Sequence, residues 1–309
     1  MQDNGNGRLK LSELVHKAIY QLEAFFDEER RREKNYLVGV PTGFTDLDIL
    51  TGGLTPGIAL IGARPELNMS DFALGLAFNT SETHRVLYFT YNSNAESLVR
   101  KLILMQGHLG YRDLREGDFH SETSSVNIVN ACGSLIKRDK EQRLIFDDSK
   151  PDTDEIYRIC DELNKEKKLD LVIIDNFQDI LPTKGAESGE NRSGYSLATD
   201  VRQGLDYLVA QISAPVLVLS ELKKTKRGER INTSHLRDWA VLEYKASPIL
   251  LLEQPIDENE DENDGAIPVN VRVENNRNGP NGIVSLTYLK SYCKYESAAK
   301  VSDEDVPRY

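Results

Sequence analysis

Apolar residues follow a helical spacing near the start of the chain. Between residues 8 and 32 they fall close to one stripe of a helix: Leu9, Leu11, Leu14, Val15, Ala18, Ile19, Leu22, Phe25 and Phe26. The spacing predicts an amphipathic helix, whose stripe has to be buried either on its own domain or on a neighbouring molecule. Residues 39–44, Gly-Val-Pro-Thr-Gly-Phe, have the composition of a turn and end this segment.

Short apolar runs then alternate with segments of helical pattern. Strands are predicted at residues 58–62, 85–90, 144–146, 169–175 and 215–219, and helices at residues 70–78, 95–109, 152–165 and 194–212. Because these strands are apolar almost throughout and are separated by helices, they predict a parallel sheet that is covered on both faces. Residues 249–253, 269–274 and 282–288 follow as strand after strand, which predicts an antiparallel extension of the sheet.

Composition favours a cytoplasmic protein. None of the 309 residues lies in an apolar run that approaches the ~18 residues of a membrane helix, and the polar start cannot be the apolar core of a signal peptide. Cys132, Cys160 and Cys293 are widely spaced and have no metal-ligand spacing, so we interpret them as buried, reduced thiols.

Charge is distributed unevenly along the chain. The net charge of −12 argues against a uniformly basic nucleic-acid binder. Much of the acidity lies in residues 257–264, which are expected to form a solvated loop, whereas five basic residues cluster within residues 223–230. DNA binding is not excluded, because a ring-shaped protein needs positive charge only along its channel.

Several motifs, in order along the chain, resemble the motor domain of DnaB-type replicative helicases. They are residues 39–48 (GVPTGFTDLD), 53–54 (GL), 63–65 (ARP), 171–178 (LVIIDNFQ), 190–192 (ENR), 236–238 (LRD) and 276–282 (NRNGPNG). Each is weak evidence alone, but their shared order and spacing over residues 11–296 are specific. The resemblance implies an α/β, RecA-like fold with a mainly parallel sheet and helices on both faces.

The same resemblance implies a domain organisation. Residues 1–34 correspond to an arm with the linker-type helix that docks on the adjacent subunit, residues 35–296 to the motor domain, and residues 297–309 to a polar tail. No segment resembles the family's helical N-terminal domain. Self-association as a ring, a hexamer if the chain is family-like, is therefore expected; the alternative is a helix packed on its own domain.

The segment that matches the phosphate-binding loop departs from its motif. Such a loop needs small residues, amides that point at the phosphates, and a lysine for the terminal phosphates. The segment begins Ala63-Arg64-Pro65 and ends with Asn68, Met69 and Ser70 at the last glycine, lysine and metal-binding hydroxyl positions. Asn tolerates the left-handed turn, but Met69 carries no charge, and Glu66 adds a negative one.

A second departure affects the base. The resemblance places a catalytic glutamate after the strand at residues 85–90, and Asn92 stands there; an amide cannot accept the proton at neutral pH. Asp175 remains and, with Ser70, is expected to hold Mg²⁺ only if a Mg²⁺–nucleotide complex binds. Glu221 stands where the family usually has a glutamine sensor. No active catalytic residue is therefore predicted, and Mg²⁺ and ATP are expected to bind weakly, if at all.

Two further sets of residues match the family's contacts. The expected single-stranded DNA contacts are Arg192, Lys223, Lys224, Lys226, Arg227, Arg237 and Asp238, since basic loops supply sequence-independent phosphate contacts. The alternative is a solvated polar loop. Arg277 matches the arginine that the family inserts into a neighbouring subunit's ATP site; the alternative is a solvated flank of a hairpin turn.

These observations predict a non-hydrolysing helicase-like protein that acts in DNA replication or on a mobile element, by binding single-stranded DNA, a helicase ring, or both. Two alternatives stay open. One is an active ATP-dependent 5′–3′ DNA helicase with unrecognised replacements in its site. The other is a ring or filament scaffold without a nucleic-acid role.

Overall fold

The computed structural model describes residues 37–110, 122–181, 194–222, 231–235, 245–255 and 265–298, together with a few positions in residues 11–19 and Leu242. The chain divides into two compact units, Met1–Leu37 and Val38–Tyr309. All helices and strands named below belong to the second unit. The domain boundaries expected at residues 34 and 296 stay predictions.

One nine-stranded sheet runs through this unit, in the order β3-β2-β4-β5-β1-β6-β7-β8-β9. The strands are β1 Gly57–Ala63, β2 Val86–Thr90, β3 Leu144–Asp147, β4 Leu171–Asp175, β5 Pro215–Glu221, β6 Ile249–Glu253, β7 Ala266–Glu274, β8 Gly282–Leu289 and β9 Lys294–Ser297. The first six in spatial order are parallel, and β7, β8 and β9 extend them antiparallel. Both predictions for the sheet are confirmed; β9 was not predicted.

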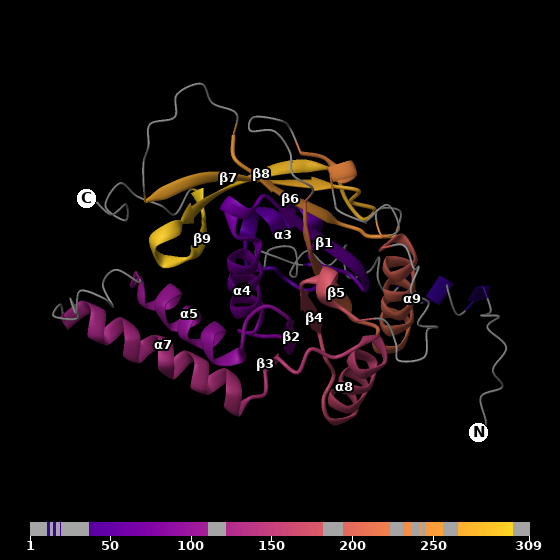
Figure 1. The fold of residues 1–309 in the computed structure, drawn as a ribbon, viewed down its shortest axis with the longest axis horizontal. Helices are drawn as coiled ribbons and strands as arrows, with labels where there is room; N and C mark the ends of the chain where they lie inside the picture. Colours follow the sequence, from indigo (N-terminus) through magenta and orange to yellow (C-terminus); the bar gives the residue numbers. More distant parts are fainter. Residues whose placement is uncertain are drawn as a thin grey trace. The chain divides into compact units, whose positions relative to one another are not determined.

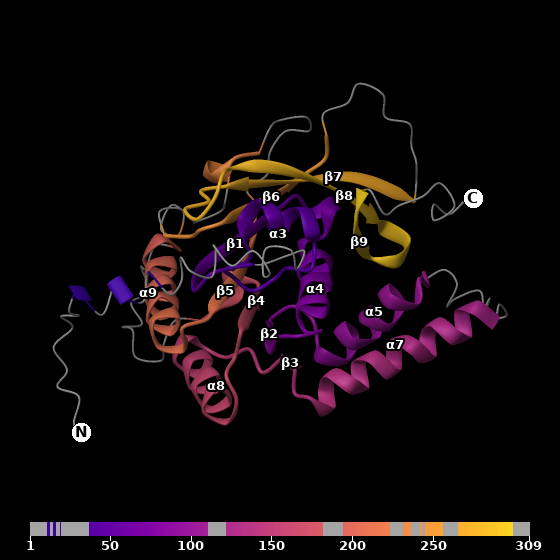
Figure 2. The same cartoon turned by 180° about the vertical axis from the view of Figure 1, so that it is seen from behind.

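Helices cover both faces of the sheet. The helices are α3 Thr45–Thr51, α4 Met69–Thr80, α5 Ala95–Gly107, α7 Glu122–Lys140, α8 Thr153–Glu166 and α9 Gly194–Ile212, with 3-10 turns η1 Pro65–Leu67, η2 Phe177–Asp179, η3 Thr233–His235 and η4 Lys290–Tyr292. Figure 1 shows α4, α5 and α7 on one side of the parallel strands and α8 and α9 on the other, and Figure 2 shows the same division from behind. The RecA-like α/β prediction is confirmed.

Alternation along each strand builds two separate cores. In β1, Ile61 packs into the cluster on the α4 face and Leu60 into the cluster on the α9 face. In β2, Tyr88 likewise packs into the cluster on the α4 face and Leu87 into the cluster on the α9 face. Successive side chains of a strand point to opposite faces, so a strand that is apolar at every position has to be buried on both.

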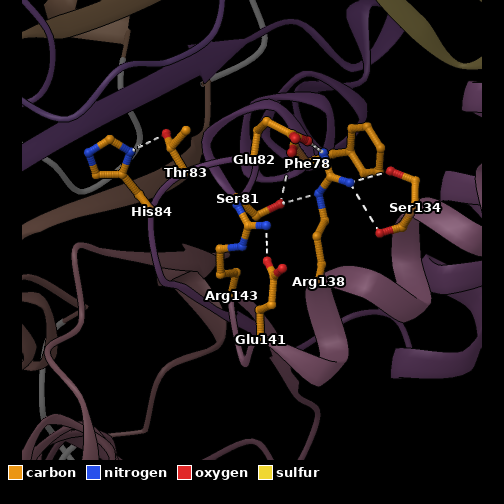
Figure 3. Close-up of polar contacts among 9 residues, drawn as sticks. All are labelled: Phe78, Ser81, Glu82, Thr83, His84, Ser134, Arg138, Glu141 and Arg143. Carbon is orange, nitrogen blue, oxygen red and sulfur yellow. Dashed lines mark hydrogen bonds and ion pairs between the residues drawn. The ribbon is translucent and has the colours of Figure 1, made fainter.

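Helix α7 was not predicted from the sequence. Its buried attachment is Arg138, which lies over the Phe78 ring with the guanidinium carbon 4.0 Å from the centroid. Arg138 also donates to Ser81 Oγ at 3.0 Å and pairs with Glu82, so that α7 is fixed to the end of α4 (Figure 3). The outer face of α7 leaves Val126, Val129 and Ile136 more than half exposed.

Candidate nucleotide-binding site

A strand–loop–helix unit lies where the phosphate-binding loop was predicted. Strand β1 ends at Ala63, residues 65–67 form the turn η1, and α4 begins at Met69. Asn68 joins the turn to the helix with left-handed backbone angles, φ 41° and ψ 74°. Asn is one of the few residues other than Gly that adopt this region readily, so the loop keeps its turn without the motif's last glycine.

Met69, at the position where the motif's lysine is expected, contributes packing and no charge. Met69 is partly buried and packs against the apolar cluster on the α4 face. Glu66 is exposed in the same loop. Residues 63–71 include one cationic residue, Arg64, and two carboxylate residues, Glu66 and Asp71. The formal charge of this segment is therefore negative.

Asp175 lies at the end of β4, beside the start of α4. The Tyr88 hydroxyl donates to Asp175 Oδ2 at 2.8 Å, and Ser70 also hydrogen-bonds to this carboxylate. Burial raises the pKa of Asp175, while the hydrogen bonds from Ser70 and Tyr88 oppose that shift. The two predicted metal-binding oxygens are thus brought together, in a site where the carboxylate is already hydrogen-bonded to protein groups.

The carboxyl ends of neighbouring parallel strands bring the remaining candidates to the same edge. Asn92 is exposed in the bend that follows β2, whose Thr90 pairs with Asp175. Glu221 is the exposed last residue of β5 and pairs with Ala63. The loop, Asn92, Asp175 and Glu221 therefore share one edge of the sheet, which is where ligands bind in open α/β folds.

The candidate DNA residues all lie outside the described residues. They are Arg192, Lys223, Lys224, Lys226, Arg227, Arg237 and Asp238. Along the chain, residues 223–230 follow directly after Leu222, the residue that comes after β5.

Arg277 is exposed in the connection between β7 and β8. Its backbone N–H donates to Ser247 Oγ at 2.9 Å. The neighbouring Asn275 and Asn276 donate from their amides to the carbonyls of Ala246, at 2.6 Å, and Leu50, at 3.3 Å. The turn is therefore held against two other segments, which fixes the backbone at Arg277.

The structure adds a polar cluster that the sequence analysis missed. Asp71, one residue after Ser70, is fully buried and lies 2.6 Å from Lys101 Nζ of α5. Tyr288 of β8 donates to the other carboxylate oxygen at 2.7 Å. The sequence did contain a signal for this cluster: a single carboxylate within an apolar helix, in Ser-Asp-Phe-Ala-Leu. Such a carboxylate indicates a buried partner, because a buried charge has to be paired.

The family model described as the DnaB-like helicase C terminal domain matches residues 39–297. The chain belongs to this family. It is 27% identical over 285 residues to the replicative DNA helicase DnaC of Bacillus subtilis, covering 90% of this chain and 60% of that protein. It is 28% identical over 276 residues to the replicative DNA helicase DnaB of Geobacillus stearothermophilus, covering 87% of this chain and 58% of that protein.

Solved structures share the fold. A solved ATPase domain superposes with a TM-score of 0.76 at 24% identity, covering 96% of this chain and 99% of that one. A DnaB-like replicative helicase, whose structure was reported with its interactions with primase, gives a TM-score of 0.77 at 24% identity. The match covers 94% of this chain and 67% of that one. The DnaB-like chain thus spans about three fifths of the length of the curated relatives named above.

Two kinds of feature are missing from the part of the chain that the structure describes. No helix there is long and apolar enough to cross a membrane. No group of three or more His, Cys, Asp or Glu side chains in the described ranges is arranged to hold a metal ion.

Two features expected of a Mg²⁺–ATP site are present in this DnaB-like chain, but the positive charge expected there is not supplied by Met69 or Lys101. The turn at Asn68 and the Ser70–Asp175 pair are in place. Met69 stands at the expected lysine position, and Lys101 of α5 is paired with Asp71. A triphosphate needs several positive groups to hold its charge, and these residues do not supply them.

Proposed function

We propose that this chain is a non-hydrolysing member of the DnaB-like family, which acts in DNA replication or on a mobile element by binding single-stranded DNA, a helicase ring, or both. The observation that carries the proposal is the preserved turn at Asn68 beside Met69, which packs against the core. The fold of the loop is maintained although its charge is lost. A turnover assay of the wild type against Asp175→Ala tests the proposal.

Two independent functions of the site are affected. Phosphoryl transfer depends on positioning and on charge stabilisation, and the lysine position supplies neither charge nor hydrogen bonds. General-base catalysis contributes ~10²–10⁴ in rate, and the exposed amide of Asn92 cannot provide it. Each loss alone slows turnover, and both act on the same step.

An active helicase is the second candidate, because Ser70 and Asp175 remain together. Backbone amides at a helix N-terminus hold phosphate without a lysine, so weak binding of Mg²⁺ and ATP is compatible with both candidates. Only the presence or absence of ATP hydrolysis distinguishes the non-hydrolysing protein from the active helicase.

Single-stranded DNA is the proposed nucleic-acid partner, since residues 223–230 are basic in an acidic chain and match loops that grip DNA in the family. Replacing Lys223, Lys224 and Lys226 with Ala should weaken binding. It should also reduce the slope of log K against log salt by about two units, or ~0.7 per lost phosphate contact.

The matched control replaces two exposed lysines, Lys165 of α8 and Lys168 two residues beyond the end of α8, and should leave the slope unchanged. If the wild type does not bind at ~20 mM salt, where the Debye length exceeds ~20 Å, the DNA proposal fails and the scaffold alternative gains. A footprint that depended on base sequence would also contradict backbone contacts.

Self-association is proposed to use the arm of a second copy. Leu11, Val15 and Ile19, at helical spacing, are 75%, 44% and 46% exposed. Val129 of α7 is 68% exposed and lies in the exposed apolar face of that helix. The exposed apolar side chains of the arm and those of α7 would be buried together if the arm of one copy lay on α7 of the next.

Deletion of residues 1–34 should reduce the mass measured by light scattering, and Val129→Asp should do the same in the full chain. Ile49→Asp is the control, because Ile49 is 69% exposed on α3. Neither Val129→Asp nor Ile49→Asp should unfold the domain, since both side chains are exposed. An unchanged mass for the deletion and for Val129→Asp would favour an arm packed on its own domain.

A further inference from the structure

The strongest unexplained feature is the fully buried carboxylate of Asp71 in the first turn of α4. A carboxylate removed from water loses several kcal/mol of hydration unless it is paired and hydrogen-bonded. Asp71 has both kinds of partner: Lys101 Nζ at 2.6 Å from Oδ1 and the Tyr288 hydroxyl at 2.7 Å from Oδ2. The thiol of Cys293 also hydrogen-bonds to it, and burial raises the pKa of this thiol to about 11, so it remains a donor at neutral pH.

These partners come from distant parts of the chain. Lys101 is on α5, while Tyr288 and Cys293 come from the antiparallel end of the sheet. Because the lysine is only 21% exposed and the carboxylate is not exposed at all, the pair is largely shielded from solvent and salt. The first turn of the phosphate-loop helix is therefore held from two sides.

A second contact from the same antiparallel strands reaches the loop itself. The hydroxyl of Tyr295, on β9, donates to the backbone carbonyl of Leu67 in η1. Tyr295 is 4% exposed and stacks on Tyr288, with ring centroids 4.6 Å apart and planes 18° apart. Its ring also meets Phe72 of α4 edge-on, at 5.3 Å and 79°. The loop and the start of α4 are thus tied to one pair of tyrosines.

We propose that Asp71, Lys101, Tyr288 and Tyr295 form a buried clamp that fixes the phosphate loop in its turned form without nucleotide. In a loop that follows the phosphate-binding motif, backbone amides surround the phosphates and the lysine reaches the terminal ones. In this chain the lysine position is Met69, and protein groups behind the loop hold it. The inference deepens the proposed function, because a loop with a permanent internal anchor has a structural role that does not require ATP.

Hydrogen exchange of the loop, measured in the absence of nucleotide, tests the clamp. The amides of Leu67 and Asn68 donate to Arg64 O at 3.0 Å and Pro65 O at 3.2 Å, so they report whether the turn is closed. In the wild type these amides should be protected. In the double variant Tyr288→Phe, Tyr295→Phe they should exchange about tenfold faster, the factor that corresponds to ~1.4 kcal/mol and to two lost hydrogen bonds.

The control is Tyr157→Phe, the same chemical change in a tyrosine of α8 that contacts Tyr207 on the other face of the sheet. It should leave loop exchange unchanged. For the Tyr288 and Tyr295 variants, peptides from α9 serve as an internal reference, since global destabilisation would accelerate them too. If the double variant does not fold, Tyr295→Phe alone is expected to accelerate Leu67 and Asn68 more than α9.

An unprotected loop in the wild type would overturn the clamp, as would equal exchange in the wild type and the tyrosine variants. Because no nucleotide is present, these results are independent of turnover. Failure of the clamp leaves the non-hydrolysing proposal standing, and detection of ATP hydrolysis leaves the exchange result standing.

Discussion

Replacing Arg85 with Met should lower the free energy of unfolding by about 3–5 kcal/mol, the range for breaking a buried charged contact. Arg85 is 2% exposed and donates to the backbone carbonyls of Gln142, Leu163 and Lys167. Two of these carbonyls belong to the end of α8, where a cation also interacts favourably with the helix dipole. Met fills much of the space but leaves the carbonyls without these donors.

Thermal unfolding measures this effect. For a domain of this size, the loss corresponds to a fall in Tm of roughly 10 °C. The control is Arg100→Met on α5, where the guanidinium is 60% exposed and pairs with Glu96 four residues before it; such surface pairs contribute ~0.5 kcal/mol or less. Equal Tm values for the two variants would show that Arg85 does not anchor α8.

Restoring ATP hydrolysis should require several substitutions. Met69→Lys alone is expected to tighten ATP binding roughly tenfold to a hundredfold, as for a hydrogen bond to a charged group, without measurable turnover. Adding Asn92→Glu supplies the base, worth ~10²–10⁴ in rate. Asn68→Gly removes the side chain from the left-handed position of the loop. The triple variant should therefore be the first to hydrolyse ATP.

The control for restoration is the triple variant with Asp175→Ala, which should again be inactive. A second control is Glu96→Gln in the triple variant. It removes an exposed carboxylate of α5 that has no assigned role in the site, so ATP hydrolysis should persist. Efficient hydrolysis by Met69→Lys alone would show that Asn92 does not occupy the position of the base.

The sequence predicted the parallel sheet because its strands are apolar at consecutive positions. The expected strand at residues 169–175 is β4, and the one at residues 215–219 is β5, with shifts of two residues at the ends. The candidate site followed from motif spacing, and the structure brings two of its residues, Ser70 and Asp175, within hydrogen-bonding distance. The local pattern of apolar residues was sufficient to predict an element where the residues that favour its backbone conformation are also the buried ones.

Helix α7 could not be predicted in this way. Its sequence is rich in Ser, Asn and other residues of low helix propensity, and three of its large apolar residues point outward. The largest side chain that it buries is Arg138, which the pattern of apolar residues does not reveal. The Asp71 cluster was missed for a related reason: its partners are 30 and 217 residues away along the chain.

The most direct test of the central claim is the steady-state ATPase rate of the wild type with Mg²⁺ and single-stranded DNA, compared with that of Asp175→Ala. Because Met69 and Asn92 are proposed to stand in the positions of the phosphate cation and the base, we expect the two proteins to give the same rate, equal to the blank. DNA-stimulated turnover near the enzyme median of ~10 per second, abolished by Asp175→Ala, would contradict the account and identify an active motor.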